Sequence, residues 1–359
     1  MRRKTGAPTI NDVAAMAEVS KRTVTRVINR SSKVNEATRA RVEKVIEQLN
    51  YAPNRQARGL AASRSFLIGL VYDVPTLFIN DIQKGVLGII EDEGYELVVH
   101  ACHYQSEGLV EDITRFVNRA HLDGVIVLPP VSDIDGIGLE LEKAGCPYVR
   151  VTSDVSDDSS RLVVTDYLSA ISDMTRHLVE LGHRDFGFIS GPNTHLSSRK
   201  RYEAFVKALA SHDIDLLPET VFEGAYTFDS GVRAANELLS RDRRPTAIFA
   251  ANDEMAFGVI KVAHQLGLII PDDLSLVGFD GTPFSTFVVP SLSTIIRQTD
   301  AMARLATQKM LAQINEETDT ASAFETMISP RFMPRESTGP APGLWSTSGN
   351  TSQRNNEYE

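Results

Sequence analysis

The sequence contains little of what disulfide frameworks and membrane spans need. Only two of its 359 residues are cysteines, Cys102 and Cys146, too few for a disulfide framework or a thiolate zinc site. We therefore expect two buried free thiols and no redox chemistry. No apolar run approaches the roughly 18 residues that a membrane span needs, and MRRKTGAPTI at the N-terminus leads into no signal-peptide core. These absences predict a cytoplasmic protein with no membrane contact.

Signatures of catalysis and of metal binding are also missing. The chain has no P-loop, no GxGxxG and no GxSxG motif. Its eight histidines show no HExxH motif or other paired ligand spacing, and we expect HLVELGH (177–183) to be a helix with its C-terminal turn. The sequence accordingly predicts a protein that is not an enzyme and that has no metal and no cofactor.

Charges of the two signs are divided unevenly along the chain. Residues 1–65 contain 14 Lys/Arg and 5 Asp/Glu, a net charge of +9, whereas the other 294 residues hold 23 basic and 42 acidic groups, a net charge of −19. A basic head on an acidic body indicates a polyanion as the partner of the head. A solvated basic arm has the same composition, so the residue pattern within the head must decide between the two.

The head has the residue pattern of three short helices. In TINDVAAMAEVSKRTVTRVIN (9–29) we expect two helices joined by a tight turn, with Thr9 and Asp12 in a capping box at the first and Ser20 as the cap of the second. A third helix is expected from about Asn35. Apolar residues recur at helical spacing in all three and predict a small shared core. This is a helix-turn-helix pattern, which is typical of DNA binding.

The outward face of the second helix carries the residues expected to contact DNA. In a helix-turn-helix, this helix enters the major groove with its N-terminal residues at the base edges. Lys21 and Arg22 are the predicted base readers, because arginine can bond guanine O6 and N7 together. Thr25, Arg26 and Asn29 are candidates for base or phosphate contacts. Thr9 and Ser20, at the starts of the first and second helices, are also among the predicted DNA-binding residues. The alternative is an ordinary solvated face on a helical hairpin.

From residue 65 onward, short β-branched runs alternate with amphipathic stretches. This is the pattern of repeated βαβ units, and hence of parallel sheets covered by helices on both faces. The first set of predicted strands is SFLIGLVY (65–72), YELVVHA (95–101), DGVIVLPP (123–130) and PYVRVTS (147–153). The second set is RLVVTD (161–166), RDFGFISG (184–191), TVFEGA (220–225), TAIFAAND (246–253) and LSLVGFD (274–280). Two similar lobes are implied, and LSTIIRQ (292–298) and ETMISPRFMPR (325–335) are expected to cross back between them.

Polar residues follow several of these predicted strands. They are Asp73, Asp166, Asn252, Asp253 and Asp280. Ligands of open parallel sheets collect beyond the carboxyl ends of the strands, and two facing lobes form a cleft there. Carboxylates and amides engage the paired hydroxyls of a sugar. The sequence therefore predicts a carbohydrate site between the lobes.

The segment TINDVAAMAEVSKRTVTRVIN, followed by VNEATRARVEKVIEQLNYAPNRQARGLAASRS, resembles the N-terminus of the LacI/GalR (lactose repressor) family of bacterial regulators. The resemblance implies that the segment after the third helix is a hinge, which becomes helical on operator DNA and places a leucine in the minor groove. Matched position by position, NYAPNRQARGLA puts this leucine at Leu60, with Ala57 beside it and Asn54 as the cap. A leucine from each subunit would partly unstack a base step and bend the duplex. The alternative is a plain linker without DNA contact.

The body resembles the core of the same family, itself similar to periplasmic sugar-binding proteins, and the resemblance covers roughly residues 5–335. It implies that Arg201 in SSRKRYEAF, Asn252 in AANDEMAFG and Asp280 in VGFDG bind the effector. It also implies that Asp253 is a structural cap and that Tyr226 in EGAYTF is an aromatic sugar platform.

Three further residues are expected to line the cleft. Asp73 follows the first strand, Phe78 lies in the loop after it, and Arg297 in IRQ lies near the crossover. The chain departs from the family pattern at Ala204, Gly281 and Thr152, the last of which stands where some members have an acidic ligand. These departures leave the exact effector open. The alternative for each predicted site residue is a satisfied turn, cap or packing position.

The predicted fold class is an all-α helix-turn-helix DNA-binding head joined by a hinge to a two-lobed α/β, periplasmic-binding-protein-like core with parallel sheets. The expected boundaries are 1–52 for the head, 53–64 for the hinge, 65–335 for the core and 336–359 for a disordered tail. Within the core, we expect lobe one at about 65–163 plus 296–322 and lobe two at about 164–295 plus 323–335. The tail has no leucine heptad, so we expect a homodimer and no tetramer of that kind, with the outer helices of the first lobe as its interface.

Together these patterns predict a sequence-specific transcriptional regulator, a repressor, whose partners are operator DNA and a small carbohydrate effector. A purine or nucleoside effector is the alternative within this class, since Arg201 and Asp280 suit a base as well as a sugar. A solute-binding protein is a second class, disfavoured by the basic head and the missing signal peptide. A sugar-metabolising enzyme with a two-lobed α/β fold is the third.

Overall fold

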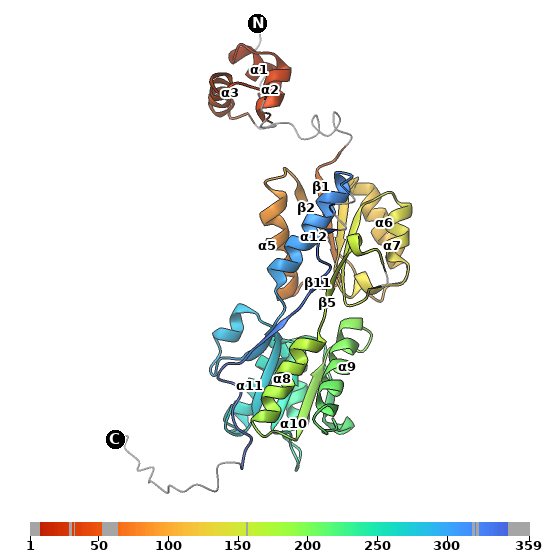
Figure 1. Ribbon diagram of the computed structural model, residues 1–359, viewed down its shortest axis with the longest axis vertical. Coiled ribbons are helices and arrows are strands. Elements are labelled where there is room, and N and C mark those ends of the chain that lie inside the picture. The colour runs from red at the N-terminus through yellow and green to blue at the C-terminus, as the bar shows by residue number, and fades with distance from the viewer. Residues whose placement is uncertain are drawn as a thin grey trace, which may run out of the picture. The chain divides into compact units, whose positions relative to one another are not determined.

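The structure, a computed structural model, consists of two compact units that divide between residues 66 and 67 (Figure 1). It describes residues 8–28, 31, 33–51, 64–155, 157–317, 320 and 323–343. The first unit contains the predicted helical head, and the second contains the predicted two-lobed core.

The head is a bundle of three short helices. They are α1 (Ile10–Met16), α2 (Lys21–Ile28) and α3 (Glu36–Leu49). Each buries one apolar stripe, and the stripes meet in a single cluster made of Val13, Ala14, Ala17, Val24, Val27, Val42, Val45 and Tyr51. The shared core that the helical spacing predicts is confirmed.

Side-chain caps fix where the three helices begin. At α1, the Thr9 backbone N–H donates to Asp12 Oδ2 at 2.8 Å, and the Thr9 hydroxyl donates to the same oxygen at 2.7 Å. At α2, Ser20 Oγ accepts the Thr23 backbone N–H at 3.1 Å. At α3, the Asn35 side chain accepts a backbone N–H three residues on at 2.8 Å. Because these bonds satisfy N–H groups that a helix start leaves unpaired, the short helices have defined first turns.

The first lobe of the core is built on a six-stranded parallel sheet of order β11-β5-β4-β3-β1-β2. Its strands are β1 (Leu67–Tyr72), β2 (Glu96–Ala101), β3 (Gly124–Val127), β4 (Tyr148–Thr152), β5 (Leu162–Thr165) and β11 (Met327–Ile328). Helices α5 (Leu77–Ile90) and α12 (Thr299–Ile314) lie on one side of it, and α6 (Leu109–Ala120) and α7 (Ile137–Lys143) lie on the other (Figure 1). Strands β3, β4 and β5 are buried throughout, which is why they read as continuous apolar runs.

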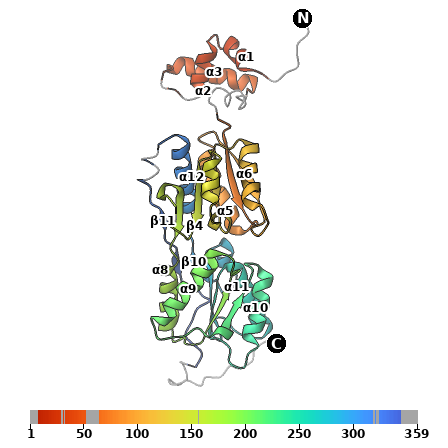
Figure 2. The ribbon, with the colours of Figure 1, turned by 90° about the vertical axis from the view of Figure 1, so that its right-hand side faces the viewer.

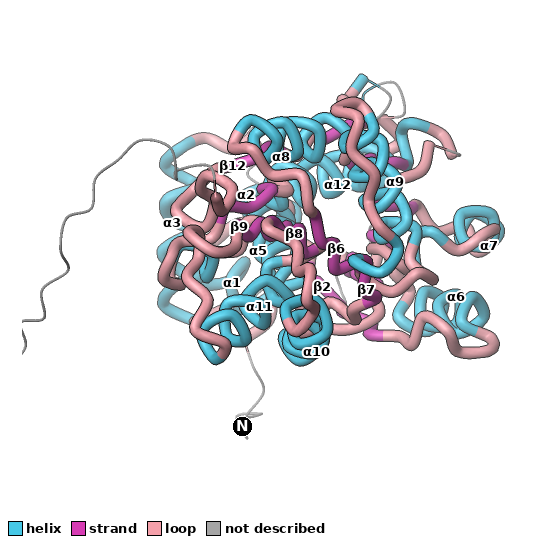
Figure 3. The backbone as a smooth tube through the Cα atoms, turned by 90° about the horizontal axis from the view of Figure 1, so that it is seen from below, coloured by secondary structure: helices cyan, strands magenta, loops and turns pink. Residues whose placement is uncertain are grey.

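The second lobe repeats this design. Its sheet has the order β12-β10-β9-β8-β6-β7, with β12 antiparallel to β10 and the other pairs parallel. The strands are β6 (Phe186–Ser190), β7 (Val221–Glu223), β8 (Ala247–Ala250), β9 (Ser275–Asp280), β10 (Ser293–Ile296) and β12 (Arg331–Met333). Figure 3 shows them between α8 (Leu168–Glu180) with α9 (Leu196–Ala210) on one side and α10 (Phe228–Leu239) with α11 (Asp253–Gln265) on the other. Short 3-10 turns are η1 (Val131–Asp133), η2 (Ser159–Arg161), η3 (Pro218–Thr220) and η4 (Pro283–Thr286).

In the described residues, the chain passes from lobe to lobe around residues 166, 298 and 330. The strand β10 belongs to the second sheet and the following helix α12 to the first lobe, while β11 pairs in the first sheet and β12 in the second (Figure 2). The prediction that LSTIIRQ and ETMISPRFMPR cross between the lobes is confirmed.

Strands β5 and β11 were expected in the second lobe but lie in the first. The run RLVVTD was assigned to the second set, but β5 pairs with β4 in the first sheet. Residues 323–335 were assigned to lobe two, but β11 pairs with β5 in the first sheet. The described residues between β4 and β5 form the turn η2 and no α-helix, so the covering helix is α12, far along the chain. Its Lys309 Nζ donates to the Ser159 and Leu162 carbonyls at 2.6 and 2.8 Å.

The chain stays in contact with the second lobe beyond the point where a disordered tail was expected. Ser337 is buried, its N–H donates to Ser291 O at 3.0 Å, and its carbonyl accepts from Leu276 at 2.8 Å. The buried His183 ring lies 2.9 Å from Ser275 Oγ and 3.0 Å from Gly339 O. The prediction of a tail from residue 336 is therefore wrong for residues 336–343. That prediction rested on the lack of apolar periodicity, whereas these residues are held by hydrogen bonds of backbone and hydroxyl groups. The rest of the predicted tail lies outside the described residues.

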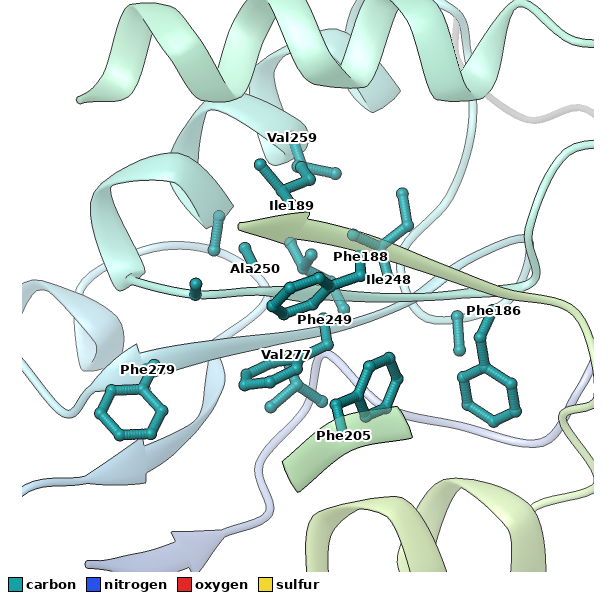
Figure 4. Close-up of a cluster of buried hydrophobic side chains, with 14 of the residues drawn as sticks. Phe186, Phe188, Ile189, Phe205, Ile248, Phe249, Ala250, Val259, Val277 and Phe279 are labelled. Atoms are coloured by element: carbon teal, nitrogen blue, oxygen red, sulfur yellow. The ribbon is translucent and has the colours of Figure 1, made fainter. Parts of the chain in front are cut away.

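An aromatic cluster holds α9 against the second sheet. Phe188 in β6 and Phe249 in β8 have ring centroids 5.3 Å apart, and Phe205 of α9 lies 5.5 and 5.3 Å from them (Figure 4). All three side chains are fully buried. Arg201 lies four residues before Phe205 on α9, and residues four apart share one face of a helix. Arg201 therefore faces the sheet as Phe205 does.

Both cysteines are buried and free, as expected. Burial raises the pKa of each thiol to about 12, so neither is a reactive thiolate. Among the described residues, no helix has the length and apolarity of a membrane span.

Candidate functional site

The second helix of the head presents a polar face. Lys21, Arg22 and Thr25 are exposed on it, whereas Val24 and Val27 are buried in the head. The Thr25 hydroxyl donates back to the Lys21 carbonyl at 3.0 Å. The structure thus places the two predicted base readers together, both exposed, at the start of α2.

The remaining predicted DNA contacts divide into two groups. Thr9 and Ser20 are exposed at the starts of α1 and α2, and Arg26 is partly exposed in the last turn of α2. The other predicted contacts lie outside the described residues, and they are Asn29, Asn54, Ala57 and Leu60.

A cavity of about 500 Å³ lies between the two lobes of the core. The first lobe contributes the loop after β1 and the start of α5, and the second lobe contributes the ends of several strands. All seven side chains predicted for the effector site line this cavity, namely Asp73, Phe78, Arg201, Tyr226, Asn252, Asp280 and Arg297. Their role in binding stays a prediction, but the structure brings them to one place.

Arg201 is held rigidly in the wall of the cavity. The side chain is only 3% exposed, and its guanidinium carbon lies 3.7 Å from the centroid of the Phe279 ring and 5.0 Å from that of Tyr167. One terminal nitrogen donates to the Ala251 carbonyl. Its Nε is also buried and has no hydrogen-bond partner among the described atoms.

Arg297 and Phe78 meet across the cavity from different lobes. The guanidinium carbon of Arg297, just after β10, lies 3.7 Å from the centroid of the Phe78 ring at the start of α5. A cation over an aromatic face is attracted to it. Arg297 Nη1 also lies 3.6 Å from Asp280 Oδ1. Of the described atoms, none forms a hydrogen bond with Arg297 Nε.

Asp280 is a partly buried carboxylate in the lining of the cavity. It ends β9 with a φ of 111°, an unusual value for a residue with a side chain. Its Oδ1 has no hydrogen-bond partner within the described structure. Burial raises the pKa of Asp280, whereas Arg297 and Arg201 act in the opposite direction. A ligand hydroxyl at this point would supply the missing donor.

Tyr226 and Asn252 form one corner of the cavity. Tyr226 adopts a positive φ of 59°, and its buried hydroxyl has no partner in the described part of the chain. Its ring occupies the space beside Gly191, where an added Cβ would meet the ring at 2.0 Å. Asn252 Nδ2 donates to the Tyr226 carbonyl at 2.9 Å, and Asn252 Oδ1 accepts the Met255 N–H at 3.0 Å. Asn252 is therefore itself the cap of α11.

The prediction that Asp253 is the cap is wrong. Asp253 is the first residue of the helix and is completely buried. Its Oδ2 accepts the Thr282 backbone N–H at 2.7 Å and the Thr282 hydroxyl at 3.0 Å, and its Oδ1 accepts the Thr294 hydroxyl at 2.6 Å. Burial, with the nearby Asp280 charge, raises the pKa of Asp253 to about 7.

Three polar residues at strand ends are used in different ways. Asp73 lines the cavity, and its Oδ1 accepts the Tyr104 backbone N–H at 3.1 Å. Asp166 is not part of the cavity lining, and its Oδ1 accepts the Leu168 N–H at 3.0 Å at the start of α8. Thr152 donates its hydroxyl to Asp133 Oδ1 at 2.6 Å and also does not line the cavity.

Sequence reasoning missed His195 and Tyr104. His195 lines the cavity with its ring 5.9 Å from that of Tyr226 and 5.4 Å from that of Tyr104. Burial lowers the pKa of His195, so the ring is neutral near pH 7. The Tyr104 hydroxyl, from the first lobe, donates to the Thr194 carbonyl of the second at 3.4 Å. The position of His195 in the loop after β6 was the available signal, since the other strand-end residues were found by that rule.

Four polar atoms of the side chains that line the cavity are buried without a hydrogen-bond partner among the described residues. They are Arg201 Nε, Arg297 Nε, Asp280 Oδ1 and the Tyr226 hydroxyl. The set has fixed donors, a fixed acceptor and a hydroxyl that serves as either. A small polar ligand that carries several hydroxyl or ring-nitrogen groups satisfies such a set.

Two family profiles match the chain. The profile described as "Bacterial regulatory proteins, lacI family" matches residues 9–54, and the "Periplasmic binding protein-like domain" profile matches residues 175–338. The catabolite control protein A of Priestia megaterium is 32% identical over 319 residues, which cover 88% of this chain and 96% of that protein.

Solved structures show the same architecture over nearly the whole chain. The Lac repressor dimer bound to operator and the anti-inducer ONPF is similar with a TM-score of 0.76 and 27% identity, covering 93% of this chain and 100% of that chain. A complex of the transcriptional regulator CelR with cellobiose is similar with a TM-score of 0.67 and 29% identity, covering 92% of this chain and 99% of that chain.

Proposed function

The chain belongs to the LacI family of bacterial regulatory proteins, and we propose that its interlobe cavity binds a small carbohydrate that controls how tightly the head holds operator DNA. The chain is a DNA-binding transcriptional regulator with the two-lobed fold of that family. The proposal concerns which residues do the work and what they bind. Operator binding would place the protein with the DNA, in the cytoplasm, and no catalytic step is part of the mechanism.

The observation that supports the carbohydrate assignment is the set of charged, amide and aromatic side chains that line the cavity, of which Arg201, Arg297, Asp280 and Tyr226 each have a buried polar atom without a hydrogen-bond partner among the described residues. Asp280 offers an acceptor, and Arg201 and Arg297 offer planar donors that match pairs of hydroxyls. Phe78 and Tyr226 supply aromatic surface for the C–H face of a sugar ring. A volume of about 500 Å³ is within the range of small-molecule sites. The similar structure that holds cellobiose supports the same class.

A purine or nucleoside is the second candidate. Asp280 Oδ1 and Arg201 Nε form an acceptor and donor set that also suits the edge of a base. The neutral His195 ring adds an aromatic face to the same wall. The two candidates differ in the number of hydroxyls they bring, so a panel that contains both separates them.

On the DNA side, we assign base reading to Lys21 and Arg22, with Thr25, Arg26 and Asn29 as base or phosphate contacts. The hinge at 53–64, with Asn54, Ala57 and Leu60, is assigned to the minor groove. The protein acts as a homodimer on a partly palindromic operator, because two heads match two half-sites. The similar Lac repressor structure is a dimer on operator.

Control follows from linkage between the two sites. A ligand that favours one arrangement of the lobes shifts the dimer toward the form with that arrangement. A coupling of about 1–3 kcal/mol changes operator affinity roughly 5- to 150-fold, and operator DNA changes effector affinity by the same factor.

The test is a thermal-shift screen of the full-length protein with monosaccharides, disaccharides, nucleosides and purines. A compound at 100 times its Kd adds about 2.7 kcal/mol of native stability. A sugar that shifts the melting temperature and changes the gel-shift affinity for operator supports the proposal. A hit among the purines moves the assignment to the second candidate, and a panel without any hit refutes both.

A further inference from the structure

Asp253 carries a buried carboxylate that the proposed effector site does not use. The residue is completely buried at the first position of α11 and is not among the described residues that line the cavity. Both of its oxygens accept hydrogen bonds from within the second lobe. It is thus neither the cap of the helix nor a contact of the effector. Burying a carboxylate costs free energy unless it is well hydrogen-bonded. We therefore ask what the hydrogen bonds of Asp253 hold in place.

The donors to Asp253 come from the two segments that hold the ion pair of the cavity. The backbone N–H and hydroxyl of Thr282 bind Oδ2, and Thr282 lies two residues after Asp280. The Thr294 hydroxyl binds Oδ1, and Thr294 lies in β10, three residues before Arg297. One carboxylate therefore ties together the strand ends that carry Asp280 and Arg297.

The turn after β9 has a backbone that needs such an anchor. Asp280 and Gly281 have φ values of 111° and 71°, and a positive φ is unfavourable for an aspartate unless its surroundings hold it there. The Thr282 N–H follows this turn directly, and Asp253 accepts it. The sheet makes room for the carboxylate at Gly278, where an added Cβ would meet Asp253 Oδ1 at 2.4 Å.

We propose that Asp253 is a positioning residue for effector binding: by bonding Thr282 and Thr294 it fixes the turn at residues 280–282 and aims the Asp280 carboxylate into the cavity. The inference rests on the proposed effector role of that cavity. Asp253 acts through Asp280 and touches no ligand itself.

Thr294 gives the cleanest test, because it is buried away from the cavity and its hydroxyl serves Asp253. Valine at this position keeps the volume and removes the hydroxyl, whereas serine keeps the hydroxyl and removes a methyl group. At pH 8, we expect Thr294→Val to weaken binding of the most stabilising panel compound about tenfold, as loss of a charge-assisted hydrogen bond does. Thr294→Ser should stay within about twofold of the wild type. The reverse order would mean that packing matters and would overturn the proposal.

A double-mutant cycle separates positioning from general destabilisation. Asp253→Asn should weaken effector binding about tenfold in the wild type and less than about twofold in an Asp280→Asn background, because its effect passes through Asp280. Equal losses in both backgrounds would refute the role. Operator binding without effector should be unchanged in Thr294→Val and Thr294→Ser, and Asp273→Asn, at an aspartate that accepts a nearby backbone N–H, is the matched control.

The failure of this inference is distinct from the failure of the proposed function. If no compound of the panel shifts the wild-type protein, the effector assignment is refuted, and a crystal structure of full-length Asp253→Asn decides the inference alone. A displaced Asp280 and Thr282 would support it. The same two residues in unchanged positions would overturn it.

Discussion

Replacing Arg201 with lysine tests the shape of the cavity while its charge is retained. The guanidinium of Arg201 is buried and stacked 3.7 Å from the centroid of the Phe279 ring, with one terminal nitrogen on the Ala251 carbonyl and Nε directed to no described partner. Lysine keeps a positive charge but has a single, compact donor group in place of the planar fork. Any effect on effector affinity then reports the geometry of the donors.

The structure sets the size of the expected effect. A hydrogen bond to a charged group contributes about 1.5–3 kcal/mol, so loss of the bond that Arg201 Nε offers raises the effector Kd about 10- to 150-fold. Loss of the contact with Phe279 lowers the free energy of unfolding by about 0.5–2 kcal/mol. Because the head is a separate unit, operator affinity without effector should equal that of the wild type.

The assay is isothermal titration of the panel compound into both proteins, followed by a gel shift on operator with and without that compound. Arg176→Lys is the matched control, since Arg176 is exposed on α8 and pairs with Asp173 on the same helix. It should bind effector as the wild type does. An unchanged effector Kd in Arg201→Lys would show that Arg201 is a packing residue and would remove it from the site.

Further predictions concern the head, the buried carboxylate and the C-terminal segment. Arg22→Ala should cost about 1–3 kcal/mol at one base pair when operator variants are compared, and uniform weakening across all of them would make Arg22 a phosphate contact. Burial raises the pKa of Asp253 from 3.8 to about 7, so the folded chain retains a proton that the unfolded chain loses. Its contribution therefore makes the free energy of unfolding fall as the pH rises from about 4 to about 7; urea titrations should show less of this decline in Asp253→Asn, and identical slopes would contradict the shift. Ser337→Ala removes a hydroxyl that bonds two buried backbone groups and should lower the free energy of unfolding by about 1–3 kcal/mol. The exposed Thr286→Ala should change it by less than about 0.5 kcal/mol, and similar values for the two variants would show that the segment is not held in place.

Local patterns predicted the head well, because the capping residue and the apolar spacing of each helix lie within a short stretch of sequence. Ser20 and Asn35 cap the helices that follow them, and the apolar residues at helical spacing meet in one core. The strand-end rule, which depends only on the direction of parallel strands, found Asp73, Asn252 and Asp280 in the cavity lining, but Asp166 and Asp253 do not line the cavity. Residues as far apart as Asp73 and Asp280 were brought together by that rule and by the resemblance.

Sheet membership was not predictable from the strands themselves. The runs that form β5 and β11 are short and apolar like every other strand, so neither their composition nor their period shows which sheet they join. The partner of β5 depends on α12, which covers it from about 140 residues later and fastens it through Lys309. A contact at that sequence distance leaves no local signal.

The mistaken assignment of the helix cap to Asp253 has a similar cause. Both residues suit a helix start, and sequence alone does not say which of them faces the end of the helix. The structure turns Asp253 under β9 because Gly278 leaves space there and because Thr282 and Thr294 offer donors. Those three positions were visible only as a glycine and two threonines within strands and turns.

The contact between Arg297 and Phe78 connects the cavity to two helices of the first lobe. Phe78 is the second residue of α5, and Arg297 lies just before α12. These two helices pack closely, since a Cβ at Gly85 would meet the Ala303 Cβ at 2.5 Å. A ligand that binds Arg297 Nε or displaces the Phe78 ring therefore acts on the starts of both helices at once. Closely packed helices move as a unit more readily than they deform, so a displacement at the start of one of these helices should pass to the other.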